Sequence, residues 1–129
     1  MNKSIETILI IKLSAIGDVI HSLPLLEVLR GRFPSAKIDW VVEEDASNVL
    51  EDHPCIDQLF IFPRKSWLKR FIRKGEFIAV KNEASSFFRQ LKNRKYDIVI
   101  DLQGLLKSGI LTFLVRGKRK IGLNGAREG

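Results

Sequence analysis

The stretch ILIIKLSAIGDVIHSLP, from Ile8 to Pro24, decides how this sequence folds. Its opening run of apolar residues is typical of a strand that is buried on both faces. Small and turn-prone residues follow, and then a carboxylate, Asp18, leads into apolar residues at helical spacing. This order predicts a buried strand, a tight loop and a helix. Ligands of open α/β sheets bind beyond the carboxyl ends of the strands, so residues 14–18 are the expected place for chemistry.

Length and composition indicate a single globular domain. The chain has 129 residues, of which 45% are hydrophobic, and this argues against disorder. No apolar run approaches the roughly 18 residues that a membrane span requires, and the N-terminal residues do not match a signal peptide. The single Cys55 excludes an internal disulfide. A net charge of +7 favours an anionic partner, which could be nucleic acid, a phosphorylated sugar or an anionic membrane surface.

Strand and helix patterns alternate along the chain. Strands are predicted over residues 7–13, 37–43, 56–62, 96–102 and 120–123, and helices over residues 46–51, 64–74, 79–94 and 105–115. For the first helix we expect Ser22 to be the cap, with Pro24 in the first turn and the end at Pro34. Residues 14–21 are then a loop with at most one short turn. The alternation predicts a three-layer, Rossmann-like α/β domain with a mainly parallel sheet.

The most strongly charged stretch is RKSWLKRFIRK, residues 64–74. Its apolar residues are Trp67, Leu68, Phe71 and Ile72, and their spacing predicts one apolar helix face with the remaining face basic. Three interpretations stay open from the residues alone. The helix is a solvated amphipathic surface, an anion-binding surface, or a contact with a membrane or a nucleic acid.

Four segments carry a resemblance to a known family. They are KLSAIGDVIHSLP (residues 12–24), IDWVVEE (38–44), YDIVIDLQGLLKS (96–108) and AREG (126–129), in that order. Together they resemble glycosyltransferase family 9, and within it the lipopolysaccharide heptosyltransferase I branch. The resemblance implies that residues 1–129 form the N-terminal, acceptor-binding half of a GT-B fold. The C-terminal nucleotide-sugar domain of such enzymes is absent from this chain, so we expect the chain alone to have little or no transferase activity.

The resemblance also implies a reaction. Heptose would pass from ADP-L-glycero-D-manno-heptose to a Kdo residue of the lipopolysaccharide inner core on lipid A, with inversion. Asp18, within the motif GDV, would be the base that takes the proton from the acceptor hydroxyl. From the local sequence alone, a carboxylate that complements a helix start remains the alternative. The family's position implies the cytoplasmic face of the inner membrane, with peripheral membrane contact.

The remaining site residues divide into two groups. The resemblance places Ser14, Ala15 and Gly17 near the donor diphosphate, with Lys12 at the strand end; a plain tight turn is the alternative, since one glycine does not make a dinucleotide fingerprint. The implied acceptor contacts are Lys65, Lys69, Gln103, Gly104, Lys107 and Arg127.

Asp101 has a simpler reading as the cap of the turn after its strand. No metal or other cofactor and no nucleic-acid partner are expected. The alternative function is a basic α/β module that docks on an anionic membrane or a nucleic acid without catalysis. A large distance between the basic helix and Asp18 would favour this non-catalytic module. A position of both at one site would favour the transferase. A nucleotide-binding regulator is a third possibility, which the missing glycine fingerprint weakens.

Overall fold

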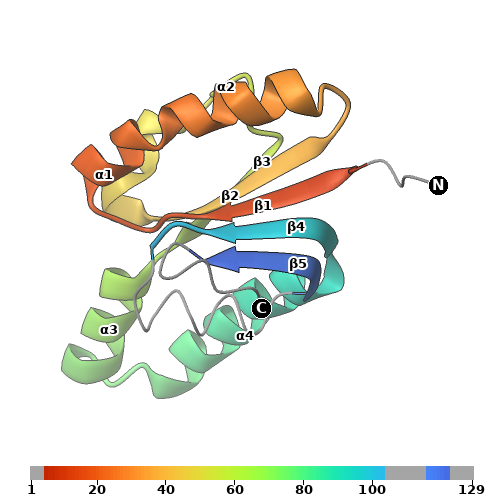
Figure 1. Ribbon diagram of the computed structural model, residues 1–129. Coiled ribbons are helices and arrows are strands. Elements are labelled where there is room, and N and C mark those ends of the chain that lie inside the picture. Colours follow the sequence, from red (N-terminus) through yellow and green to blue (C-terminus); the bar gives the residue numbers. More distant parts are fainter. Residues whose placement is uncertain (1–4, 104–115, 123–129) are drawn as a thin grey trace.

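A computed structural model describes residues 5–103 and 116–122 of the chain, and side chains are described for residues 5–103 (Figure 1). Five parallel strands form one sheet in the order β3-β2-β1-β4-β5. The strands are β1 (Thr7–Ile11), β2 (Lys37–Glu43), β3 (Gln58–Phe62), β4 (Lys95–Asp101) and β5 (Arg116–Gly122). The helices are α1 (Ile16–His21), α2 (Leu23–Arg32), the 3₁₀ helix η1 (Glu44–Val49), α3 (Arg64–Arg73) and α4 (Phe77–Asn93). The predicted parallel α/β fold is confirmed.

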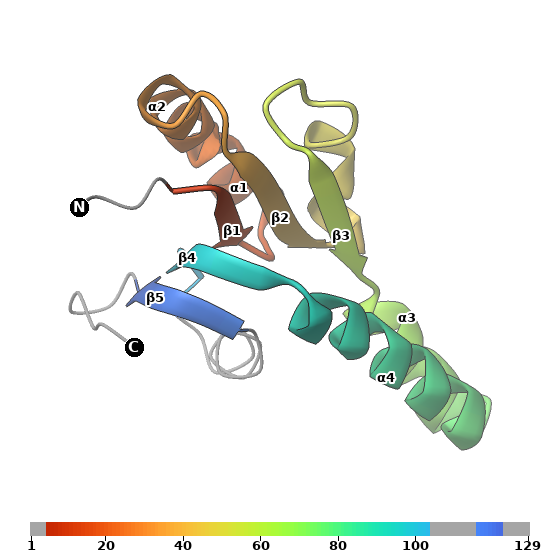
Figure 2. The same cartoon turned by 90° about the vertical axis from the view of Figure 1, so that its right-hand side faces the viewer.

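Helices cover both faces of the sheet, as the alternation in β1 requires. Ile8 and Ile10 pack into one buried cluster with residues of α1, α2 and η1, while Leu9 and Ile11 pack into a second cluster with residues of α3 and α4. All four side chains are fully buried. The chain moves outward from β1 to β3 and then returns to β4, so right-handed crossovers must place α3 and α4 on the opposite face from α2. Figure 2 shows the resulting three layers.

The loop predicted over residues 14–21 is wrong, because residues 16–21 form the short helix α1. The backbone N–H of Val19 donates to the carbonyl of Ala15 at 2.9 Å, and the Val19 side chain is fully buried in the cluster that contains residues of α2, η1 and the sheet. Burial of the Val19 side chain favours the helix α1 over an extended loop. Ser22 precedes α2, but its hydroxyl donates to the Asp18 carbonyl at 2.9 Å and makes no cap bond. Pro24 lies in the first turn of α2, as predicted.

Several predicted boundaries also differ. β1 ends at Ile11 rather than residue 13, and the helix expected over residues 46–51 is the 3₁₀ helix η1. β3 begins at Gln58 because Asp57 ends the preceding turn: its carboxylate accepts the Ile38 N–H at 2.7 Å. β5 begins at Arg116, four residues before the predicted strand. The helix predicted over residues 105–115 lies outside the described residues. Within the described ranges, no helix has both the length and the apolar character to cross a bilayer.

Candidate functional site

The carboxyl ends of β1, β2, β3 and β4 lie at the same edge of the sheet. Ile11 of β1 is in register with Val41 of β2 and with Asp101 of β4, and Glu43 of β2 is in register with Phe62 of β3. The segments that follow these strands therefore emerge together. They are the loop before α1, the helix η1, the start of α3 and the turn at residues 102–103 (Figure 1, left-hand side).

The side chain of Gln103 fixes the loop that follows β1. Its Oε1 atom accepts hydrogen bonds from the backbone N–H groups of Leu13 at 2.9 Å and Ser14 at 3.1 Å. The Gln103 N–H in turn donates to the Asp101 carboxylate at 2.9 Å, which confirms the predicted turn cap. The peptide bond between Ser14 and Ala15 is cis. The family resemblance implies that Gln103 lies on the acceptor side of the site. In the structure, its side-chain oxygen binds the loop that follows β1.

Lys12 is buried beneath this loop. Its Nζ donates to the Leu102 carbonyl at 3.4 Å, and its own carbonyl accepts the Trp40 indole N–H at 3.1 Å. The ammonium group thus lies at the end of β4, beside the Gln103 turn. The sequence left open whether Lys12 faces the site or is a solvated strand end. Its burial shows that the solvated strand end is wrong.

Asp18 is the third residue of α1, and its side chain is exposed at this edge. Within the described part of the chain, its carboxylate has no hydrogen-bond or ion-pair partner, and α1 has no side-chain cap at Ala15. Residues 16–18 form the first turn of α1, and backbone N–H groups in the first turn of a helix have no intrahelical acceptor. The Asp18 carboxylate thus belongs to the same helix turn as these N–H donors. Such a set can accept a proton and contact an anion.

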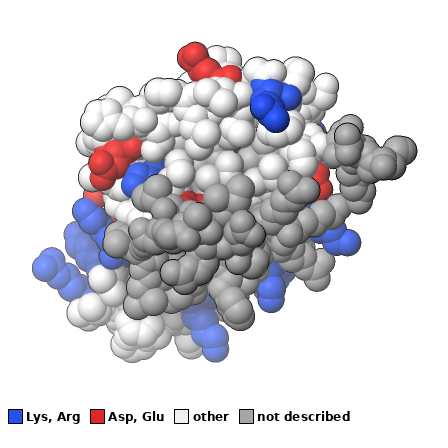
Figure 3. All heavy atoms as spheres, in the orientation of Figure 1, with Lys and Arg blue, Asp and Glu red and all other residues white. Residues whose placement is uncertain are grey.

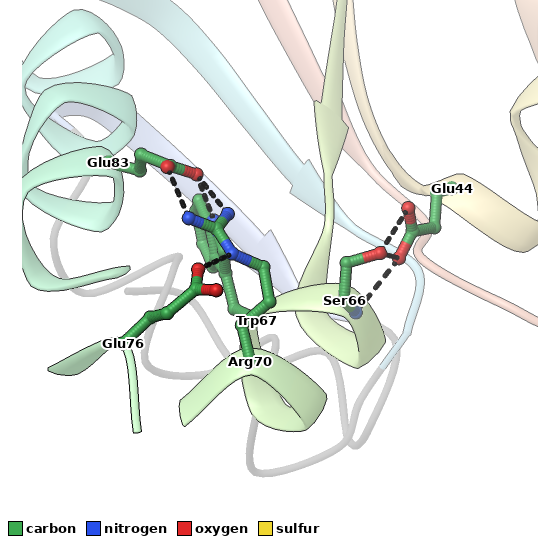
Figure 4. A network of polar contacts seen from close by, with 6 residues as sticks. All are labelled: Glu44, Ser66, Trp67, Arg70, Glu76 and Glu83. Carbon is green, nitrogen blue, oxygen red and sulfur yellow. Dashed lines mark hydrogen bonds and ion pairs between the residues drawn. The ribbon is translucent and has the colours of Figure 1, made fainter. Parts of the chain in front are cut away.

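Acidic residues at the end of β2 hold the start of α3 at the same edge. The Glu43 carboxylate accepts the Arg64 Nε–H at 2.8 Å, and the Lys65 ammonium pairs with Asp45. The Glu44 carboxylate accepts both the N–H and the hydroxyl of Ser66, at 3.1 and 2.8 Å (Figure 4). A carboxylate at this place also complements the N-terminal end of the α3 dipole. The sequence signal for these contacts is a run of three acidic residues, Glu43 at the end of β2 and Glu44 and Asp45 at the start of η1.

Arg70 binds α3 to α4. Its guanidinium donates in a bidentate manner to Glu83, at 2.8 Å for both bonds, and donates through Nε to Glu76 at 2.7 Å (Figure 4). The Trp67 indole N–H also donates to Glu83, at 3.1 Å. The hydrogen bonds from Arg70 and then Trp67 lower the pKa of Glu83 to about 2, and those from Glu83 and Glu76 raise the pKa of Arg70. The two helices are thus joined as one hairpin.

The predicted faces of α3 need correction. Trp67 is buried against the aromatic rings of Phe62 and Phe87, but Leu68, Phe71 and Ile72 are exposed. Trp67 is the residue of α3 that belongs to the buried cluster against the sheet. Of the six basic residues, three are paired with carboxylates; within the described residues, no ion pair holds the other three, which are Lys69, Arg73 and Lys74.

Known proteins resemble this chain in sequence and in fold. The family model described as glycosyltransferase family 9 (heptosyltransferase) matches residues 84–128. Lipopolysaccharide heptosyltransferase 1 of Pseudomonas aeruginosa is 37% identical over 126 residues, and that of Escherichia coli is 38% identical over 124 residues. Each alignment covers 94% of this chain. The chain is thus similar to the heptosyltransferases of glycosyltransferase family 9. It spans 34% and 37% of the lengths of these two relatives.

One solved structure matches the fold of this chain over part of its own length. The Escherichia coli heptosyltransferase WaaC with ADP-2-deoxy-2-fluoro heptose matches with a TM-score of 0.79 and 35% identity. The match covers 94% of this chain and 38% of that one. The resemblance of the four sequence segments to family 9 is therefore confirmed.

The structure brings most of the residues predicted from the family motifs to one edge of the sheet. These are Lys12, Ser14, Ala15, Gly17, Asp18, Lys65 and Gln103. Lys69 lies one turn further along α3. Gly104, Lys107 and Arg127 lie outside the described residues. Within the described ranges, no group of three His, Cys, Asp or Glu side chains is placed to hold a metal ion.

Proposed function

We propose that this chain supplies the acceptor-side domain of a glycosyltransferase that moves heptose from ADP-L-glycero-D-manno-heptose to Kdo of the lipopolysaccharide inner core. The observation that carries the proposal is the similarity to lipopolysaccharide heptosyltransferase 1 along 94% of the chain. The fold match to a heptosyltransferase with an ADP-heptose analogue supports the donor. The start of α3 lies at the sheet edge that carries Asp18, and this supports a transferase over a separate, non-catalytic basic module.

In the proposed reaction Asp18 is the general base. Its carboxylate takes the proton of the acceptor hydroxyl, the oxygen attacks the anomeric carbon of the heptose, and the bond to the ADP oxygen breaks with inversion. The exposure of Asp18 and the absence of a partner for it among the described residues leave both of its oxygens available to the acceptor. The N–H groups of residues 16–18 would stabilise negative charge that develops on the departing diphosphate.

The start of α3 supplies cations for the acid groups of the acceptor. Lys65 is exposed and pairs with Asp45, and a pair between two exposed groups contributes little stability. A Kdo carboxylate or a lipid A phosphate can therefore replace Asp45 as the partner of Lys65 at small cost. Lys69, one turn along α3, extends this positive surface. Gly104, Lys107 and Arg127 belong to the same proposal, on the motifs alone. Such an acceptor would require the enzyme to work at the cytoplasmic face of the inner membrane, and this location is part of the proposal.

The test is ADP release from ADP-heptose, with a Kdo₂-lipid A acceptor, by the full-length protein that carries this sequence. We expect Asp18→Asn to lower turnover by about 10²-fold or more, since general-base catalysis typically contributes at least this factor. Asp52→Asn is the matched control: Asp52 is exposed and has a φ of 61°, which asparagine also adopts readily. Unchanged turnover in Asp18→Asn would assign that carboxylate to the start of α1 alone.

A further inference from the structure

The tip of the α3–α4 hairpin exposes large apolar side chains that no part of the described structure covers. Ile72 at the end of α3 is 70% exposed and Ile78 at the start of α4 is 76% exposed. Phe71 and Phe77 lie between them, with ring centroids 4.7 Å apart, and both are about half exposed. Gly75, with a φ of 64°, forms the turn that brings the two helix ends together. Apolar side chains gathered on one exposed surface are typical of interaction sites.

Basic residues surround these apolar side chains. Lys65, Leu68, Lys69, Ile72 and Arg73 line one open depression along α3, so cations and apolar groups alternate on a single face. Lys74 follows at the turn. Figure 3 shows basic side chains gathered over α3 at the lower left of the molecule. As described above, Lys69, Arg73 and Lys74 have no ion-pair partner among the described residues, so their charge is available.

We propose that this hairpin tip, formed by Phe71, Ile72, Arg73, Lys74, Phe77 and Ile78, docks on an anionic lipid bilayer. An amphipathic surface with apolar residues at its centre and Lys or Arg around them inserts the apolar groups at the level of the lipid headgroups, while the cations bind anionic headgroups. A nucleic acid or a free phosphate would use the cations but not the isoleucines. The inference deepens the proposed membrane contact, yet its evidence is the hairpin alone and includes no step of the transfer reaction.

The geometry of the hairpin supports docking at its tip. α3 and α4 extend together away from the sheet in Figure 2, so the tip can reach a flat surface before the rest of the described chain does. Arg70, Glu76 and Glu83 lock the two helices to each other close to the tip. The apolar side chains are therefore held on a preformed surface, which lowers the entropy lost on docking.

The experiment measures sedimentation of the 129-residue chain with lipid vesicles. One set contains phosphatidylethanolamine with about 30% phosphatidylglycerol, and the other contains only phosphatidylcholine. We expect binding to the anionic set. Arg73→Gln with Lys74→Gln should weaken it by about tenfold or more, since each cation near such a surface contributes about fivefold. Ile72→Ser with Ile78→Ser should weaken it by a similar factor.

Matched controls separate the tip from overall charge and hydrophobicity. Arg32→Gln with Lys37→Gln removes two exposed cations at the end of α2 and the start of β2, and Val28→Ser changes an apolar residue of α2 that is 64% exposed. These controls should bind like the original chain. Equal losses in tip and control variants would overturn the proposal, as would cation dependence without isoleucine dependence, which indicates a polyanion site.

Two further results would also overturn it. One is the absence of binding to either set of vesicles; the other is a concentration-dependent dimer that the isoleucine changes abolish, which assigns the tip to a second copy of the chain. Because the vesicles contain neither lipopolysaccharide nor sugar nucleotide, the result is independent of the Asp18 experiment. Binding without transfer and transfer without binding are separate outcomes.

Discussion

The side-chain oxygen of Gln103 accepts the backbone N–H of Leu13 at 2.9 Å, and this bond joins the end of β4 to the loop that precedes α1. Ser14 N–H donates to the same oxygen at 3.1 Å. Leu13 is fully buried, and its N–H lies behind the partly exposed side chain of Gln103. One side chain from the far end of the sequence therefore shapes the loop that carries the candidate site.

We expect Gln103→Ala to lower the free energy of unfolding by roughly 1–3 kcal/mol, because it leaves a buried donor unsatisfied. Gln103→Glu retains an acceptor and should cost less. Urea unfolding at neutral pH measures both, with Gln90→Ala on the exposed face of α4 as the control. A Gln103→Ala variant as stable as the Gln90→Ala control would show that the loop finds other acceptors.

We expect Gly17→Ala to affect ligand binding but not the stability of the fold. A Cβ atom at Gly17 would meet no described atom within 4 Å, so the fold should tolerate it. Since alanine is favoured over glycine in helices by up to about 1 kcal/mol, the stability should stay equal or rise. In the full-length protein, however, the methyl group would stand beside the N–H donors proposed for the diphosphate. We expect a raised KM for ADP-heptose. An unchanged KM would place the diphosphate away from this turn.

Tyr96→Phe should destabilise the protein more at pH 7 than at pH 3. The Tyr96 hydroxyl donates to the Asp39 carboxylate at 2.7 Å, and both groups are buried. Burial raises the pKa of Asp39, while the bond from Tyr96 and the charge of Arg94 act in the opposite direction. Removal of the hydroxyl leaves the ionised carboxylate without its strongest partner, at a cost of about 1.5–3 kcal/mol. Urea unfolding at the two pH values measures the difference.

The sign of the pH dependence follows from the raised pKa of Asp39. Its contribution to stability is fully present below the unfolded pKa of about 3.9 and is lost as the pH rises through the folded pKa. The stability of the original chain relative to Asp39→Asn should therefore fall as the pH rises above about 4. In the Asp39→Asn background, Tyr96→Phe should lose its pH dependence. An effect that persists there would assign it to another titrating group.

The Arg70–Glu83 pair should titrate with an unusually low midpoint. The pKa of Glu83 is lowered to about 2, chiefly by the hydrogen bonds from Arg70, so its stabilising effect is present above the usual carboxyl pKa and is lost as the pH falls toward 2. The Trp67 indole N–H, which donates to Glu83, reports this titration in NMR spectra. The Trp40 indole N–H donates to the Lys12 carbonyl and is an internal control. In Arg70→Gln the midpoint should rise, and an unchanged midpoint would contradict the pairing.

The sequence predicted the fold well because its strands are strongly apolar and its helices have clear periodicity. The predictions from the sequence are wrong where tertiary contacts determine the local structure. Residues 16–21 form a helix because Val19 finds a buried place, and such a place cannot be read from local pattern. Spacing alone could not show that Trp67 would fill the contact with the sheet and leave Phe71 and Ile72 exposed. The loop contacts of Gln103 join residues about 90 positions apart, beyond the range of any local signal.

The connection from β3 to β4 can vary in length between related proteins. It crosses β2 and β1, and it contains the whole of α3, α4 and the turn at Gly75. Residues inserted at this turn would lengthen the two helices without a change in any strand pairing. Two enzymes with identical sheets can therefore differ in how far this arm reaches. If the tip docks on a membrane as proposed, each added helical turn would change the distance between the membrane surface and the sheet edge by about 5.4 Å.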